Sequence, residues 1–168
     1  MHSIKILISI LFILMCNIAF AQTDSNAIFE SNKGKLPFPL KNSTYPDEFY
    51  IQAYKGCFRY TKSETSKEEP YLSFFRKKSE DVFAIFDAKV LIVEQIDSIS
   101  YFVITKFGDY FISYVFLNKP KCQVGNFIKK GEIIASLSKN ENENYSLDLY
   151  ISKGMKNLDC KEWLFPIK

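Results

Sequence analysis

Histidine is almost absent from this chain. The 168 residues contain one histidine, His2, which lies in an N-terminal segment that we expect to be removed. Ser-His-Asp and Cys-His nucleophile systems need an imidazole as the base. Zinc favours nitrogen and sulfur ligands. Loss of His2 would therefore exclude every mechanism that uses imidazole as a base or as a metal ligand.

Glycine and cysteine are also scarce, with six and four residues. No glycine-rich loop precedes a helix, so no phosphate cradle is indicated, and Gly108-Asp109 is typical of a hairpin turn. Cys57, Cys122 and Cys160 are widely spaced and form no CxxC motif. In an oxidising compartment one pair could form a disulfide, or all three could stay buried and unpaired. The sequence does not choose the pair.

The first 21 residues have the pattern of a cleavable secretory signal. Lys5 supplies a positive charge, Ile6–Met15 is apolar, and Ala19-Phe20-Ala21 places small residues before the expected cleavage at Gln22. The apolar run is short for a membrane span of about 20 residues. A lipoprotein signal would use Cys16, but no suitable small residue precedes it. We expect a secreted or periplasmic protein with no membrane span after cleavage.

The mature chain is expected to hold one domain of nearly balanced charge. Cleavage leaves 147 of the 168 residues and lowers the formal charge from +3 to +2, because Lys5 is lost. Lysines and acids are interspersed, so there is no electrostatic footprint for nucleic acid. Residues 22–33 are polar and predict a flexible lead-in. Residues 34–168 predict the domain, beginning with an extended arm at Gly34–Leu40, where two prolines oppose helix.

Short segments rich in Val, Ile, Leu, Phe and Tyr predict an all-β fold. No window of helical length shows a capped apolar stripe, whereas turn residues bound each apolar segment. The sequences of residues 82–90 and 124–133 are also weakly similar to each other, as the sequences of two equivalent crossover segments would be. The predicted strands are Tyr71–Phe75, Val82–Phe86, Val90–Val93, Tyr101–Thr105, Tyr110–Leu117, Ile133–Leu137 and Leu147–Ile151.

Several motifs in order along the chain resemble the lysostaphin/LytM-type zinc metalloendopeptidases of the cell wall. The likeness is best over residues 82–164 and implies a compact antiparallel domain of the duplicated-hybrid-motif, barrel-sandwich-like type. The matching segments are Gly34–Leu40 for the proline-rich stretch before the sheet, Val82-Phe83-Ala84 with Ala88-Lys89-Val90 for V-x-A and G-x-V, Val124-Gly125 with Lys129–Ile134 for V-G…V-K-x-G…I-I, and Asp159–Leu164 for N-P-x-x-W-L, with Cys160 in the proline's place.

The resemblance implies a zinc site whose histidines are all replaced here. Such peptidases bind zinc through an H-x-x-x-D element and the second histidine of an H-x-H element. The first histidine of that pair and a histidine in Y-x-H-L act on the transition state. Carried onto this chain, H-x-x-x-D falls on Glu69 and Ser73, Y-x-H-L places Phe116 at its histidine, and H-x-H falls on Ser146 and Asp148. We therefore expect no catalytic residue, no metal and no cofactor.

The residues at and near the replaced positions allow other interpretations. Asp148 with Glu69 could form a weak carboxylate-only zinc site, but an ordinary solvent-facing strand residue is the favoured interpretation of Asp148. Phe107, Tyr114 and Phe116 could line a drier cleft, or could simply fill the core. Nothing in the sequence singles out a pair of carboxylates suited to glycoside hydrolysis.

The favoured function is an exported, non-catalytic LytM-like domain that binds peptidoglycan or regulates a cell-wall hydrolase. An extended wall peptide could pair with an exposed strand edge. One alternative is an active cell-wall metalloendopeptidase with atypical ligands. Another is a protein-interaction β module unrelated to the wall. The content of bound zinc separates the enzyme from the binding domains.

Overall fold

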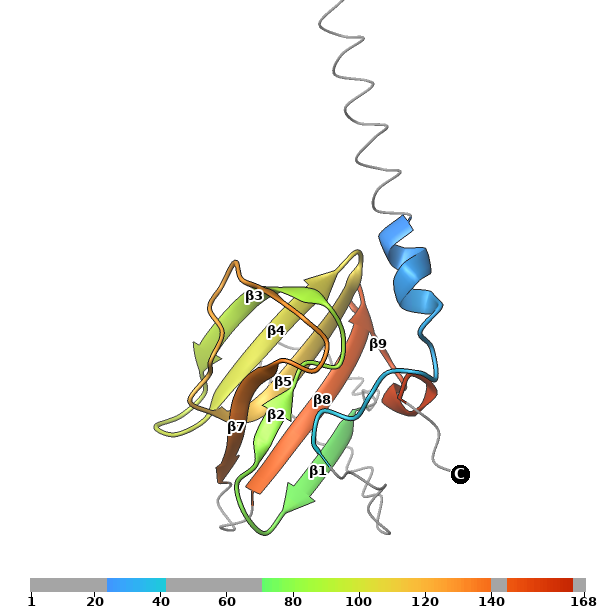
Figure 1. Ribbon diagram of the computed structural model, residues 1–168. Coiled ribbons are helices and arrows are strands. Elements are labelled where there is room, and N and C mark those ends of the chain that lie inside the picture. The colour runs from blue at the N-terminus through green and yellow to red at the C-terminus, as the bar shows by residue number, and fades with distance from the viewer. Residues whose placement is uncertain (1–23, 42–70, 140–144, 165–168) are drawn as a thin grey trace, which may run out of the picture.

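The computed structural model describes residues 24–41, 71–139 and 145–164, which form one curled antiparallel sheet with a short N-terminal helix (Figure 1). Residues 24–30 are helical, and a 3-10 turn, η1, spans Cys160–Glu162. The strands are β1 (Leu72–Arg76), β2 (Asp81–Phe83), β3 (Ala88–Gln95), β4 (Tyr101–Phe107), β5 (Tyr110–Asn118), β6 (Phe127–Ile128), β7 (Ile133–Lys139), β8 (Tyr145–Lys153) and β9 (Lys156–Leu158).

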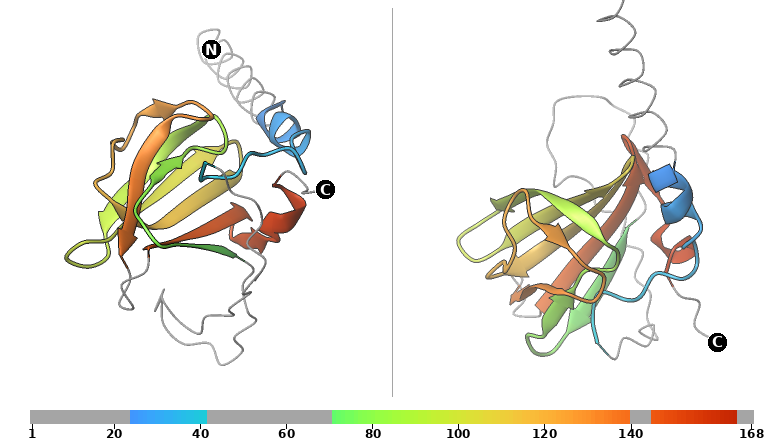
Figure 2. Two further views of the ribbon diagram at one scale, coloured as in Figure 1. Left: turned by 60° about the horizontal axis from the view of Figure 1, so that its bottom comes forward. Right: turned by 45° about the horizontal axis from the view of Figure 1, so that its top comes forward.

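The main path through the sheet is β1-β8-β7-β5-β4-β3-β6. Strand β5 changes partner along its length. Residues 110–115 pair with β8, and Leu117 and Asn118 pair with β7. This exchange curls the sheet into a half-barrel and brings β2 and β7 across one of its faces, as the views in Figures 1 and 2 show. The predicted all-β, antiparallel fold is confirmed.

The core lies between the curled sheet and the β2–β7 pair. Alternate residues along β8, Leu147, Leu149 and Ile151, are fully buried on this inner side, as the period-2 geometry of a strand requires. Trp163 and Leu164 close the core at one end. The opposite side of β1, β4, β5 and β8 carries the intervening residues, and we call it the outer face.

The two segments with similar sequences pair with each other. Around one crossover, the Gly131 N–H donates to the Ala84 carbonyl at 2.8 Å, and the Ala84 N–H donates to the Glu132 carbonyl at 2.9 Å. The Gly125 N–H bonds to the Val90 carbonyl at 2.9 Å, which joins the other ends of the segments. Gly125 and Gly131 both have positive φ, a conformation that costs glycine little. The similar sequences therefore form two facing crossovers.

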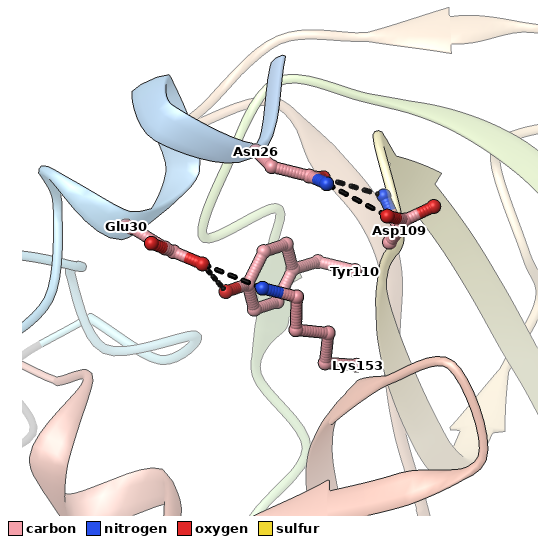
Figure 3. Close-up of polar contacts among 5 residues, drawn as sticks. All are labelled: Asn26, Glu30, Asp109, Tyr110 and Lys153. Atoms are coloured by element: carbon pink, nitrogen blue, oxygen red, sulfur yellow. Dashed lines mark hydrogen bonds and ion pairs between the residues drawn. The ribbon is translucent and has the colours of Figure 1, made fainter. Parts of the chain in front are cut away.

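The segment expected to be a flexible lead-in is partly helical and packed. Phe29 is fully buried, with its ring 4.3 Å from that of Tyr110 and 5.0 Å from that of Trp163 between centroids. Figure 3 shows polar contacts that the neighbouring Asn26 and Glu30 make with the sheet. Glu30 accepts from Lys153 Nζ at 2.7 Å and from the Tyr110 hydroxyl at 2.5 Å, and these bonds lower the pKa of Glu30.

A second pair of bonds in Figure 3 ties the helical residues 24–30 to the sheet. The Asn26 side chain donates to Asp109 Oδ2 at 2.7 Å and accepts from the Asp109 N–H at 2.8 Å. Asp109 follows Gly108 in the β4–β5 turn, where Gly108 has φ +59° and a Cβ would collide with the Asn26 side chain. The N-terminal segment is therefore part of the folded domain, because aromatic packing and two polar contacts hold it.

Cys122 and Cys160 are both free and buried, so neither of these two thiols forms a disulfide. Cys57 lies outside the described residues. Within residues 24–41, 71–139 and 145–164, no helix is long and apolar enough to cross a membrane.

Candidate functional site

Two of the replaced family positions meet on the outer face. Ser73 and Asp148 lie opposite each other in the β1–β8 ladder, and Ser73 Oγ donates to Asp148 Oδ1 at 2.5 Å. Neighbours on either side, Leu72, Leu147 and Leu149, point into the core, so the hydroxyl and the carboxylate point away from it. Ser73 and Asp148, which are 75 positions apart in the sequence, thus meet in one contact.

The environment of Asp148 disfavours its charged form. Burial raises the pKa of the Asp148 carboxyl to about 6, and the hydrogen bond from Ser73 opposes only part of that rise. Val115 lies opposite Asp148 on the other neighbouring strand, β5, and is itself buried. Asp148 is therefore a partly enclosed carboxyl between an apolar residue and a serine, and differs from the solvent-facing strand residue that we expected.

Phe116, at the third replaced position, has an unusual backbone. Its φ is +66°, a value that bulky residues rarely adopt. Tyr101 pairs with Leu117 and Phe102 with Val115, so Phe116 is the extra residue of a β-bulge in β5. It directly follows the residue opposite Asp148. Backbone strain of this kind concentrates at functional sites, and here it falls where the resemblance places a catalytic histidine.

Ser146, the fourth described position, also lies on this face but is nearly closed off from solvent. It sits two residues before Asp148 on β8 and pairs with Phe75 on β1 and with Ser138 on β7. Glu69 lies outside the described residues. The structure thus gathers Ser73, Phe116, Ser146 and Asp148 around the place where β8 exchanges β5 for β7.

The two residues expected to line a cleft lie elsewhere. Tyr114 is fully buried in the core, where its hydroxyl accepts from the Ile85 N–H at 3.0 Å. Phe107 lies opposite Tyr110 near the far end of the sheet, at the level of Lys153. That level is roughly 16 Å along β8 from Asp148, at about 3.3 Å per residue. Neither residue can line an open site beside Asp148.

Sequence reasoning missed a pair of tyrosines beside this site. Tyr71 and Tyr150 stack with centroids 4.9 Å apart and ring planes 15° apart. Tyr150 lies two residues after Asp148, and strand alternation therefore puts both on the same face. That alternation was the available signal, because Tyr150 follows Asp148 in the S-x-D-x-Y pattern of β8. The stacked rings give the outer face an aromatic wall next to the carboxyl.

The residues present do not fit zinc. A catalytic zinc needs three nitrogen, sulfur or carboxylate ligands, and the described family positions supply one carboxyl, two serine hydroxyls and a phenyl ring. Across residues 24–41, 71–139 and 145–164, no three His, Cys, Asp or Glu side chains are grouped as a metal site.

The fold is shared with peptidases of known structure. A zinc-containing peptidase from Vibrio cholerae matches with a TM-score of 0.59 at 14% identity, over 80% of this chain and 41% of that one. The antimicrobial peptidase lysostaphin from Staphylococcus simulans matches with a TM-score of 0.52 at 18% identity, over 58% of this chain and 44% of that one. The matched region thus covers less than half of either peptidase.

Two structures of the SpoIIQ–SpoIIIAH complex also contain a chain of this fold. Their TM-scores are 0.51 and 0.57 at 21% and 18% identity, over 56% and 75% of this chain and 63% and 97% of the matched chains. No protein-family model and no curated protein sequence matches. Identities this low establish the fold alone, and at that level they confirm the resemblance to the LytM-type peptidases.

Proposed function

We propose that this chain, which has the fold of the LytM-type peptidases, is an exported domain that binds peptidoglycan and does not hydrolyse it. The observation that carries the proposal is the contact between Ser73 and Asp148, the two residues onto which the resemblance carries the family's zinc ligands. These two side chains face away from the core and suit hydrogen bonding to a ligand better than metal binding. The signal-like residues 1–21 support export.

The outer face has the composition of a binding surface for an extended polar chain. Ser73, Asp148 and Ser113 offer hydroxyl and carboxyl groups, while Tyr150 and the 46%-exposed Phe75 offer aromatic surface. Aromatic rings beside hydrogen-bonding groups are typical of ligand sites that are largely preformed. Peptidoglycan combines sugar rings with short peptides, and both could contact such a face.

Co-sedimentation with intact peptidoglycan tests the proposal. The mature chain, residues 22–168, is compared with Phe75→Asp, which places a charge on the outer face, and with Ile99→Asp, a matched control at the β3–β4 turn where the side chain is 52% exposed. We expect the wild type and Ile99→Asp to sediment with the wall and Phe75→Asp to stay in solution. No sedimentation of the wild type, or release of soluble wall fragments by it, would overturn the proposal.

Regulation of a cell-wall hydrolase through a protein contact is a second candidate. The likeness to a chain crystallised in the SpoIIQ–SpoIIIAH complex favours it, since that fold there takes part in a protein complex. The two candidates use different ligands and are compatible in one molecule.

A further inference from the structure

A pocket of about 310 Å³ lies between the N-terminal segment and the β3–β6 end of the sheet, away from Asp148. Its apolar lining comes from four places in the sequence: Ile28 after the start of the helix, Phe86 before β3, Phe107 at the end of β4, and Phe127 in β6. The volume is at the lower end of the range for ligand pockets, about 300–1,000 Å³. It suits one or two side chains.

The floor of this pocket is rigid. The Phe86 ring makes edge-to-face contacts with Phe107 at 5.0 Å and with the fully buried Phe29 at 4.8 Å between centroids. Two of the side chains that line its walls are largely exposed to solvent, since Ile28 is 52% and Phe127 is 55% exposed. Exposed apolar side chains are ordinary when they are scattered, but their convergence on one preformed hollow marks an interaction site.

Lysines surround this hollow. Lys129 Nζ lies 4.9 Å from the centroid of the Phe127 ring, and Lys130 lines the pocket. Lys89 pairs with Phe127 across β3 and β6, and also lies directly opposite Lys106 across β3 and β4. Like charges in directly opposed positions destabilise a sheet.

These charges are poorly neutralised. Asp87 is the acidic residue in the lining, and it accepts from the Lys130 backbone N–H at 2.7 Å and lies 3.4 Å from Lys129 Nζ. Among the ion pairs of the described residues, none includes the ammonium group of Lys89 or of Lys130. The rim of the pocket is therefore positive overall.

We propose that this pocket binds a partner protein through a short acidic segment that carries a bulky apolar side chain. The apolar side chain fills the aromatic hollow, as anchor residues do at the centre of protein interfaces. Carboxylates beside it meet Lys89 and Lys130. Peptidoglycan peptides could supply carboxylates, but their short side chains would leave the hollow unfilled, so a protein segment is the occupant that matches both features.

This inference rests on the protein-contact candidate and is independent of peptidoglycan binding. A display library of random short peptides is selected against the mature chain, and enriched peptides are measured against three variants. Phe127→Asp places a charge in the hollow. Lys89→Glu reverses one rim charge and should not harm the fold, because it faces Lys106. Ile99→Asp is the control outside the pocket.

We expect enriched peptides to combine Asp or Glu with Leu, Ile, Phe, Met or Trp. Both Phe127→Asp and Lys89→Glu should weaken their binding at least about tenfold, whereas Ile99→Asp should not. The same pocket variants should still sediment with peptidoglycan, which separates a failure of this inference from a failure of wall binding. Absence of enrichment, enrichment of basic or fully polar peptides, or unchanged affinity for both variants would each overturn the inference.

Discussion

Ser73 on β1 and Asp148 on β8 face each other across the sheet, and the serine hydroxyl donates a 2.5 Å hydrogen bond to the carboxyl. They occupy positions where the LytM resemblance places two zinc ligands. If that mapping is correct, a direct hydrogen bond joins the two strands where the peptidases would hold zinc. The consequences of this replacement can be measured through Asp148, Phe116 and the packing around them.

Stability should fall with rising pH because of Asp148. Its folded pKa of about 6 lies above the ordinary 3.8, so its contribution is fully present below pH 3.8 and is lost as pH rises to 6. The difference corresponds to about 3 kcal/mol. Asp148→Asn keeps an acceptor for Ser73 and removes the titration. In urea denaturation from pH 4 to 8, the variant should gain stability relative to wild type up to about pH 6 and then hold that gain. A pH-independent difference would count against the assignment.

The left-handed backbone at Phe116 should be visible in a pair of substitutions. Phe116→Ala and Phe116→Gly both remove the ring, but only glycine adopts φ +66° without cost. We expect the glycine variant to be more stable than the alanine variant by about 1 kcal/mol in chemical denaturation. The reverse order would show that the bulge relaxes when the ring is absent.

The N-terminal segment should contribute strongly to folding stability. Phe29→Ala removes a fully buried ring that touches three aromatic side chains and should lower the free energy of unfolding by about 3 kcal/mol. The adjacent Ile28→Ala, at a 52%-exposed position, should change it by less than about 0.5 kcal/mol. Thermal and urea unfolding of both variants give the comparison. Equal effects would mean that the segment is not docked in solution.

The two described cysteines should be inert in the native protein. Burial raises the pKa of the Cys160 thiol to about 12 and raises that of Cys122 as well, and the thiolate is the reactive form. Iodoacetamide at pH 8 should leave both unmodified until denaturant is added, as read by peptide mass mapping. Rapid native labelling of either one would contradict its burial.

Sequence patterns predicted the sheet well because its longer strands show a local alternation of core residues and others. The predicted segment Tyr110–Leu117 lies within β5, and Leu147–Ile151 lies within β8. Both alternate between core residues and others with the period of a strand. Strands β6 and β9 were missed, since segments of two and three residues are too short to show a period.

The N-terminal helix and the site illustrate what sequence could not supply. Phe29 is buried by Phe86, Tyr110 and Trp163, and this long-range packing leaves no local pattern at residues 24–30. The resemblance located Ser73 and Asp148, but the partial burial of Asp148 depends on neighbours from two other strands. For Tyr114 the sequence left cleft and core both open, and its burial in the core became evident only once the alternation within β5 was anchored to the core.

Zinc binding by the purified mature chain tests the central claim most directly. Zinc content is measured by atomic emission after equilibration with excess zinc and removal of the free metal, and wall hydrolysis is followed in the same samples with and without chelator. The account predicts substoichiometric zinc and no chelator-sensitive release of wall fragments. One zinc per chain together with chelator-sensitive cleavage would contradict it.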